Sequence, residues 1–136
     1  MKQELIAVSS YEGEGYVPMI DFESWRVAIL NYCEELEVQN LKTMQKHDES
    51  DEVFVLLSGN CTLFTGGNGE QIGEIHMISM VPKKLYNVKK GVFHTHTLDK
   101  AGSVLIVENQ NTCDENSPTR DMTEEQIEVL KTLFCK

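Results

Sequence analysis

Short segments of β-forming residues divide the middle of the chain, and this pattern restricts the fold more than any other feature of the sequence. Turn-forming clusters separate the segments, for example at 48–51 and 66–69. Strands are expected over 24–32, 41–47, 52–58, 61–65, 72–81, 85–88, 92–97 and 103–108. Many short strands at regular spacing indicate an all-β sandwich or barrel. Trp25, Phe54 and Phe64 are expected in its core.

The last part of the chain has a helical period instead. Its apolar residues fall on one face of a helix: Ile127, Leu130, Leu133 and Phe134. Thr123 and Gln126 have the spacing of a capping box. We therefore expect a short C-terminal α-helix over about 122–134, packed on the outside of a barrel over about 20–110. A length of 136 residues suits a single domain, so residues 1–136 are expected to form one.

The composition limits the partners and the compartment. The chain carries 12 Lys and Arg against 22 Asp and Glu, a net charge of −10, which disfavours nucleic acid and anionic membrane surfaces. The N-terminus lacks the pattern of a secretory signal, and no apolar run approaches the roughly 20 residues of a membrane span. The four cysteines lie far apart in the sequence, which favours reduced thiols in a cytoplasmic protein.

Two short segments carry residues that suit metal chemistry. In a strand, residues two apart face the same side, so Gln45 and His47 point together. The following turn is expected to bring Glu52 opposite them on the neighbouring strand. His94 and His96 share one face of a later strand. Two or three imidazoles with one carboxylate suit a divalent metal such as Zn²⁺, Fe²⁺, Mn²⁺ or Ni²⁺. The alternative is a set of ordinary surface residues on a barrel that binds no metal.

These two segments resemble the motifs of the cupin superfamily. The first cupin motif runs His-x-His, three or four residues, Glu, six residues and Gly; His47, Glu52 and Gly59 match its second His, its Glu and its Gly. Gly91 and His94 match the second motif, Pro-x-Gly-x-x-His. The resemblance covers most of the chain. It implies a jelly-roll barrel, or double-stranded β-helix, in which His47, Glu52 and His94 hold one divalent metal ion.

The sequence departs from the cupin motifs at two positions. Lys89 stands where the second motif has Pro, which affects only the stiffness of a turn. Gln45 stands where the first motif has its first His. A Gln-x-His pair with a Glu and a later His resembles the zinc ligands of phosphomannose-isomerase-type cupins, which makes Gln45 a candidate fourth ligand. The alternative set takes His96 as the fourth ligand and leaves Gln45 in contact either with a metal ligand or with the substrate.

The residues and the resemblance together predict a metal-dependent enzyme that acts on a small polar metabolite. Sugar or sugar-acid isomerisation is the leading reaction, with His96 or His76 as the catalytic acid or base. Arg26 and Tyr86 are candidates for the mouth of the substrate pocket, with barrel surface or dimer interface as the alternative for both. An Fe²⁺-dependent dioxygenase is a second enzymatic hypothesis. A non-catalytic module that binds a small ligand is the alternative from another class.

Two expectations concern the surface. Four lysines form the one basic cluster of this acidic chain: Lys83, Lys84, Lys89 and Lys90. The cluster either steers a phosphate or carboxylate toward a site or forms a solvated loop. A homodimer is expected, because pairing of two chains along edge strands hides an exposed sheet edge.

Overall fold

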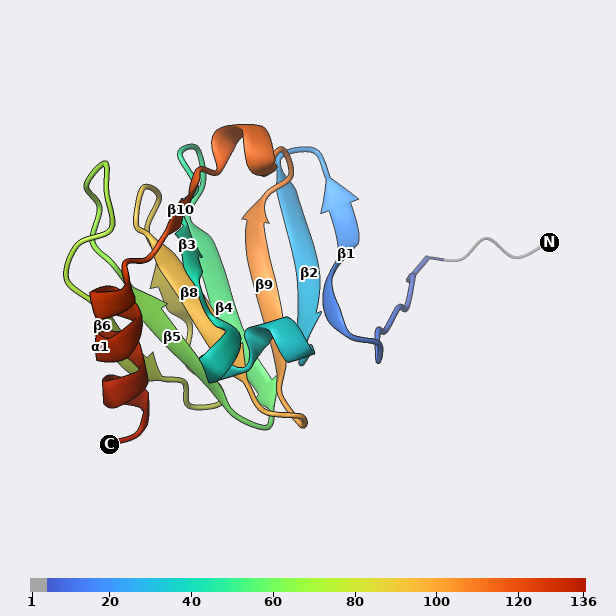
Figure 1. The fold of residues 1–136 in the computed structure, drawn as a ribbon. Coiled ribbons are helices and arrows are strands. Elements are labelled where there is room, and N and C mark those ends of the chain that lie inside the picture. Colours follow the sequence, from blue (N-terminus) through green and yellow to red (C-terminus); the bar gives the residue numbers. More distant parts are fainter. Residues whose placement is uncertain (1–4) are drawn as a thin grey trace.

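The computed structural model describes residues 5–136 and confirms the all-β architecture with one C-terminal helix (Figure 1). Two antiparallel sheets of five strands face each other in a jelly roll. The first sheet has the spatial order β1 (Gly15–Phe22), β2 (Trp25–Asn31), β9 (Ser103–Asn109), β4 (Glu52–Ser58) and β7 (Tyr86–Val88). The second has the order β10 (Thr119–Asp121), β3 (Thr43–Gln45), β8 (His94–Leu98), β5 (Cys61–Thr65) and β6 (His76–Ser79).

Successive segments of the chain cross between the two sheets. From β3 to β4, from β4 to β5, and from β8 to β9, the chain leaves one sheet and enters the other. Short 3₁₀ turns lie in two of the connections: η1 (Glu34–Leu36) and η2 (Val38–Asn40) between β2 and β3, and η3 (Asp114–Asn116) between β9 and β10. The crossings correct one prediction. Glu52 does follow a turn after His47, but β3 and β4 belong to opposite sheets rather than to neighbouring strands of one sheet.

The core between the sheets follows the two-residue period of the strands. In β4, Phe54 and Leu56 point inward, and in β9 Val104 and Ile106 do the same. Phe54 and Phe64 are fully buried, as predicted. The prediction for Trp25 is wrong. Its side chain is exposed at the start of β2, where it packs against the ring of Phe22 at the end of β1.

The helix α1 (Glu124–Phe134) covers the outer face of the second sheet beside β6 (Figure 1). The predicted capping box is present, since Thr123 and Gln126 exchange hydrogen bonds between side chain and backbone. Leu130 is fully buried in a second apolar cluster that includes Phe64 and Phe93. This helix therefore closes the outside of the sheet and leaves the interior of the barrel to other residues.

Two strands were not predicted from the sequence, and both are edge strands. β1 pairs with β2, and β10 pairs with β3. These two strands extend the barrel beyond the range of about residues 20–110 that was expected for it. The homodimer stays a prediction; β1 supplies an edge strand on which Ile20 and Phe22 are exposed. Within residues 5–136, no helix is long and apolar enough to span a membrane.

Candidate metal centre

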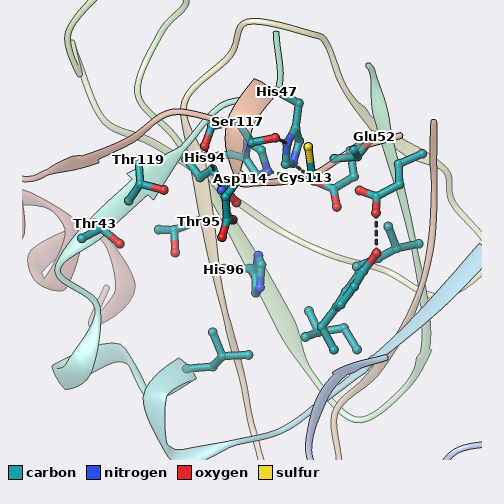
Figure 2. A pocket seen from close by; sticks show the side chains of 17 residues that line it. Thr43, His47, Glu52, His94, Thr95, His96, Cys113, Asp114, Ser117 and Thr119 are labelled. Atoms are coloured by element: carbon teal, nitrogen blue, oxygen red, sulfur yellow. Dashed lines mark hydrogen bonds and ion pairs between the residues drawn. The ribbon is translucent and has the colours of Figure 1, made fainter. Parts of the chain in front are cut away.

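His47, Glu52 and His94 come together at one end of the barrel interior (Figure 2). His47 lies just beyond β3, while Glu52 and His94 are the first residues of β4 and β8. Nε2 of His47 is 3.0 Å and Nε2 of His94 is 2.9 Å from the same oxygen, Oε1 of Glu52. All three side chains are buried, and their candidate ligand atoms lie within 4.8 Å of one another.

The local backbone explains why the two motifs meet. Gly91 has φ +80°, a conformation that favours glycine, and its N–H donates to the carbonyl of His47 at 2.8 Å. This bond ties the turn before β8 to the end of β3. At Gly59, φ is +63° and a Cβ atom would lie 2.3 Å from the carbonyl carbon of Ala101. The glycine of the first motif is therefore needed for the tight approach of two loops and not for the site itself.

The hydrogen bond at the far side of the His94 ring fixes its tautomer. Nδ1 of His94 lies 2.9 Å from the carbonyl oxygen of Val92, which can only accept, so Nδ1 carries the proton. In the neutral ring, Nε2 then presents a lone pair to Glu52. A lone pair and a carboxylate oxygen at 2.9 Å repel each other unless a proton or a metal ion lies between them.

A longer chain of hydrogen bonds fixes His47 in the same way. The backbone N–H of Cys113 and the hydroxyl of Ser117 both donate to Oδ1 of Asn116, at 3.0 Å and 3.1 Å. The Ser117 oxygen is then the acceptor for Nδ1 of His47 at 2.7 Å. Nε2 of His47 therefore also presents a lone pair to Glu52. Outer hydrogen bonds of this kind orient the histidine ligands of metal sites.

The donor set fits a divalent cation. Two neutral imidazole nitrogens and a carboxylate converge on one point, and the outer nitrogen of each ring is held by a hydrogen bond. Such N₂O sets bind Zn²⁺ and the neighbouring transition metals. In the metal-free protein, burial raises the pKa of Glu52, but the hydrogen bonds that His47 and His94 donate when their Nε2 atoms carry a proton lower it well below its usual range. Glu52 is therefore ionised throughout the neutral range.

We expect metal binding to strengthen as the pH rises from about 6 to about 8. Burial lowers the pKa of His47, but the hydrogen bond and charge of Glu52 raise it more, so the net pKa is raised. In the metal-free protein, protonated His47 therefore contributes stability below about pH 6.5, which is lost as the pH rises through the raised pKa. Metal must displace this proton, so its binding follows the opposite trend.

The measurement is the difference in thermal unfolding midpoint between protein with Zn²⁺ and protein with a chelator, at pH 6, 7 and 8. We expect this difference to grow with pH. The metal-loaded protein becomes more stable because zinc binds more tightly, while the chelated protein loses the stability that protonated His47 contributes. A difference that is constant over this range would mean that the metal does not compete with the imidazole protons.

The three residues lie in the wall of a pocket of about 390 Å³, a size typical of small-molecule sites. Hydrophilic and apolar side chains from both sheets contribute to it. The lining includes three kinds of residue. The titratable ones are His96, Glu108 and Tyr16, the hydroxyl-bearing ones are Thr43, Thr95 and Thr119, and the apolar ones are Leu30, Leu36 and Ile106.

Glu108 and Tyr16 are pocket residues that the sequence analysis missed. Glu108 is buried at the end of β9, beside Glu52 on the adjacent strand, and accepts a hydrogen bond from the Tyr16 hydroxyl. Burial and the charge of Glu52 raise the pKa of Glu108 to about 7. The sequence contained a signal for Glu108: it lies two residues after Ile106 and four after Val104, so the two-residue period of β9 turns its side chain inward as well. Tyr16 lies on the unpredicted strand β1.

The structure brings two of the other predicted residues into the pocket. Gln45 is the register partner of His94, and its side-chain nitrogen donates to the Ser117 carbonyl at 3.0 Å. His96 packs against the ring of Phe54, and its buried Nδ1 has no hydrogen-bond partner within residues 5–136. Burial lowers the pKa of His96 to about 4, and His94 lowers it too, so the ring is neutral at pH 7.

Three predicted residues lie outside the pocket lining. His76 projects from β6 toward solvent, with 67% of its side chain exposed, and pairs with Glu74 at 3.4 Å. Its catalytic role stays a prediction, since this side chain is exposed on the edge strand β6 and is absent from the pocket lining. Tyr86 packs on the core, and its hydroxyl accepts from the Val81 N–H. Arg26 does not line the pocket but contacts two residues that do, Glu108 at 3.7 Å and the carbonyl of Thr112 at 3.3 Å.

Comparison with solved structures identifies the fold. A cupin-2 domain protein from Shewanella frigidimarina matches with a TM-score of 0.52 and 16% identity, over 74% of this chain and 85% of the other. A variant of Streptomyces Pac13 with uridine matches with a TM-score of 0.60 and 9% identity, over 85% of each chain. Pac13 is described as a nucleoside dehydratase.

A third similar structure is a double mutant of the 3,4-ketoisomerase QdtA from Thermoanaerobacterium thermosaccharolyticum in complex with TDP. It has a TM-score of 0.56 and 14% identity, over 86% of this chain and 80% of the other. No protein-family model matches the sequence, and the search of curated proteins gave no match. Two facing antiparallel sheets, together with these structural likenesses, show that the chain has the cupin jelly-roll fold.

Proposed function

We propose that the chain is a metal-dependent enzyme acting on a small polar metabolite, with sugar or sugar-acid isomerisation as the leading reaction. The observation that most supports the proposal is the pair of Nε2 lone pairs, from His47 and His94, turned toward the Glu52 carboxylate in the wall of a ligand-sized pocket. A 3,4-ketoisomerase and a nucleoside dehydratase are among the proteins with this fold, so it accommodates enzymes.

Gln45 is the fourth metal donor in this proposal. Its amide nitrogen is occupied by the Ser117 carbonyl, which leaves the amide oxygen as the available donor atom beside His94. An amide oxygen is a weaker ligand than an imidazole or a carboxylate, so a substrate oxygen can replace it or bind next to it.

The proposed roles of the chain's own groups follow from their protonation. A bound divalent metal would supply Lewis-acid polarisation of a substrate carbonyl or hydroxyl. His96, neutral at pH 7, accepts the proton from the carbon beside the carbonyl. Glu108, with a pKa of about 7, is present in both forms at neutral pH, and its protonated form donates to the carbonyl oxygen, so that an enediol forms. The enediol then gives its other hydroxyl proton to the Glu108 carboxylate and takes the His96 proton at the former carbonyl carbon, which completes the isomerisation and restores both groups. Tyr16 holds the Glu108 carboxyl in place.

Proton exchange tests this proposal directly. The metal-loaded protein is incubated in D₂O with a panel of aldoses, ketoses and sugar acids, and deuterium uptake at the carbon beside the carbonyl is followed by NMR. The proposal expects uptake with at least one compound, and expects His96→Asn to lower the rate about 10²- to 10⁴-fold with the metal content unchanged. His76→Asn, in which an exposed histidine outside the pocket is replaced, is the matched control.

Two outcomes would go against the proposal. Full activity of His96→Asn would remove His96 from the reaction. Metal-loaded protein that binds a member of the panel but exchanges no proton on any of them would favour the non-catalytic binding module instead.

A further inference from the structure

The pocket wall carries negative and neutral groups only. Three of its lining residues are carboxylic acids: Glu52, Glu108 and Asp114. Within residues 5–136, no lysine or arginine lines it. A site for a phosphate ester needs cationic donors or helix N-termini aimed at the phosphate. This pocket offers an anion no such partner apart from a metal ion, whose charge the Glu52 carboxylate already reduces.

The cationic residues near the pocket are engaged elsewhere. Arg26 pairs with Asp21 at 2.8 Å and donates to the carbonyl of Thr112 at 3.3 Å. Its guanidinium also forms an ion pair with the Glu108 carboxylate at 3.7 Å. Lys46 donates to the Gly69 carbonyl. The four lysines of the basic cluster are exposed and absent from the lining, so the cluster does not form an anion site in this pocket.

The neutral part of the wall has two chemically distinct sides. Thr43, Thr95 and Thr119 come from the neighbouring strands β3, β8 and β10 and lie on the same side of the pocket (Figure 2). Apolar side chains line another part: Leu30, Leu36 and Ile106. Hydroxyl groups that donate and accept, next to apolar surface, are suited to a compound with several hydroxyls on a carbon framework.

We infer that the pocket takes an uncharged polyhydroxy compound, such as a free sugar or a nucleoside, and discriminates against its phosphate ester. The inference rests on the proposed function and narrows it, since it selects sugars over sugar acids. A phosphate dianion would bring its charge close to the carboxyl groups of Glu108 and Asp114, and its repulsion by Glu108 is the less screened by solvent because Glu108 is buried. His96 also lines the pocket and adds a polar ring to its wall.

Matched pairs of compounds test the inference. Zinc-loaded protein is titrated by calorimetry with ribose and ribose 5-phosphate, glucose and glucose 6-phosphate, and uridine and its 5′-monophosphate. The expected result is binding of at least one neutral member, with its phosphate ester at least about tenfold weaker. Esters that bind as tightly as the neutral members, or more tightly, would overturn the inference. Protein that holds zinc but binds no neutral member would overturn it as well.

A pair of charge-reversal variants shows whether the pocket wall is responsible. Asp114 lines the pocket, whereas its exposed neighbour Glu115 does not. Asp114→Lys is expected to reduce the preference for the neutral member severalfold, and Glu115→Lys, with the same change in net charge, is expected to leave it unchanged. Equal effects of the two variants would assign the discrimination to the overall charge and contradict the inference.

The metal content and the proton exchange of each sample separate failure of the proposed function from failure of the inference. Failure of the proposed function appears as protein that takes up no metal, or that takes up metal and exchanges no proton. Failure of the inference alone appears as protein that takes up metal normally and prefers the phosphate esters.

Discussion

Replacing His94 by alanine is expected to lower the affinity for Zn²⁺ by more than about 100-fold while the protein stays folded. Loss of a residue that only orients a ligand already costs about 10- to 100-fold in metal affinity, and His94 is proposed as a ligand itself. The fold should persist because protonated His47, at 3.0 Å, still pairs with the buried Glu52 carboxylate in the metal-free protein. Competition titration against a coloured chelator measures the affinity.

His76→Ala is the matched control for this experiment. His76 is also a histidine, but it is exposed on the edge strand β6, pairs with Glu74 and does not line the pocket. The His76→Ala variant should bind Zn²⁺ as the unmodified protein does. If His94→Ala and His76→Ala bound Zn²⁺ equally well, the metal would be held elsewhere and the assignment of this site would be wrong.

The second large effect concerns stability. Phe54→Ala is expected to lower the free energy of unfolding by about 3–5 kcal/mol, the usual cost of removing a buried aromatic side chain. Phe54 is fully buried at the centre of β4, and its ring packs against the rings of both His94 and His96. The cavity left behind would therefore lie directly beneath the candidate metal centre. Urea unfolding of the chelated protein measures the change.

Phe22→Ala supplies the comparison. The ring of Phe22 is more than half exposed at the end of β1 and touches Trp25, so its removal should cost less than about 1 kcal/mol. A similar loss in both variants would mean that the core does not lie between the two sheets as described.

The strands of the fold were largely predictable because their two-residue period is local. Phe54 and Leu56 in β4, and the helical face that buries Leu130, follow from spacing alone. The pairing of strands was not predictable in this way. Nothing near Gln45 in the sequence indicates that β3 lies beside β8 and β10, because the chain reaches those strands only 49 and 74 residues later, at His94 and Thr119.

The sequence predicted the candidate metal ligands but not the groups that hold them in place. His47, Glu52 and His94 stand in the two motifs, so their meeting was expected and is confirmed as a buried cluster. The groups that set their protonation were not expected. Ser117 is distant in sequence, and the Val92 carbonyl is a backbone group that any residue would provide. Such partners become visible only when the loops are placed in three dimensions.

Anomalous X-ray diffraction at the zinc edge, on crystals of the zinc-loaded protein, shows directly whether His47, Glu52 and His94 hold the metal. We expect one strong peak per chain, within bonding distance of Nε2 of His47, Nε2 of His94 and the Glu52 carboxylate. The same map would show whether the Gln45 oxygen completes the coordination. A peak at other residues, or no peak at this cluster in protein that contains stoichiometric zinc, would contradict the account.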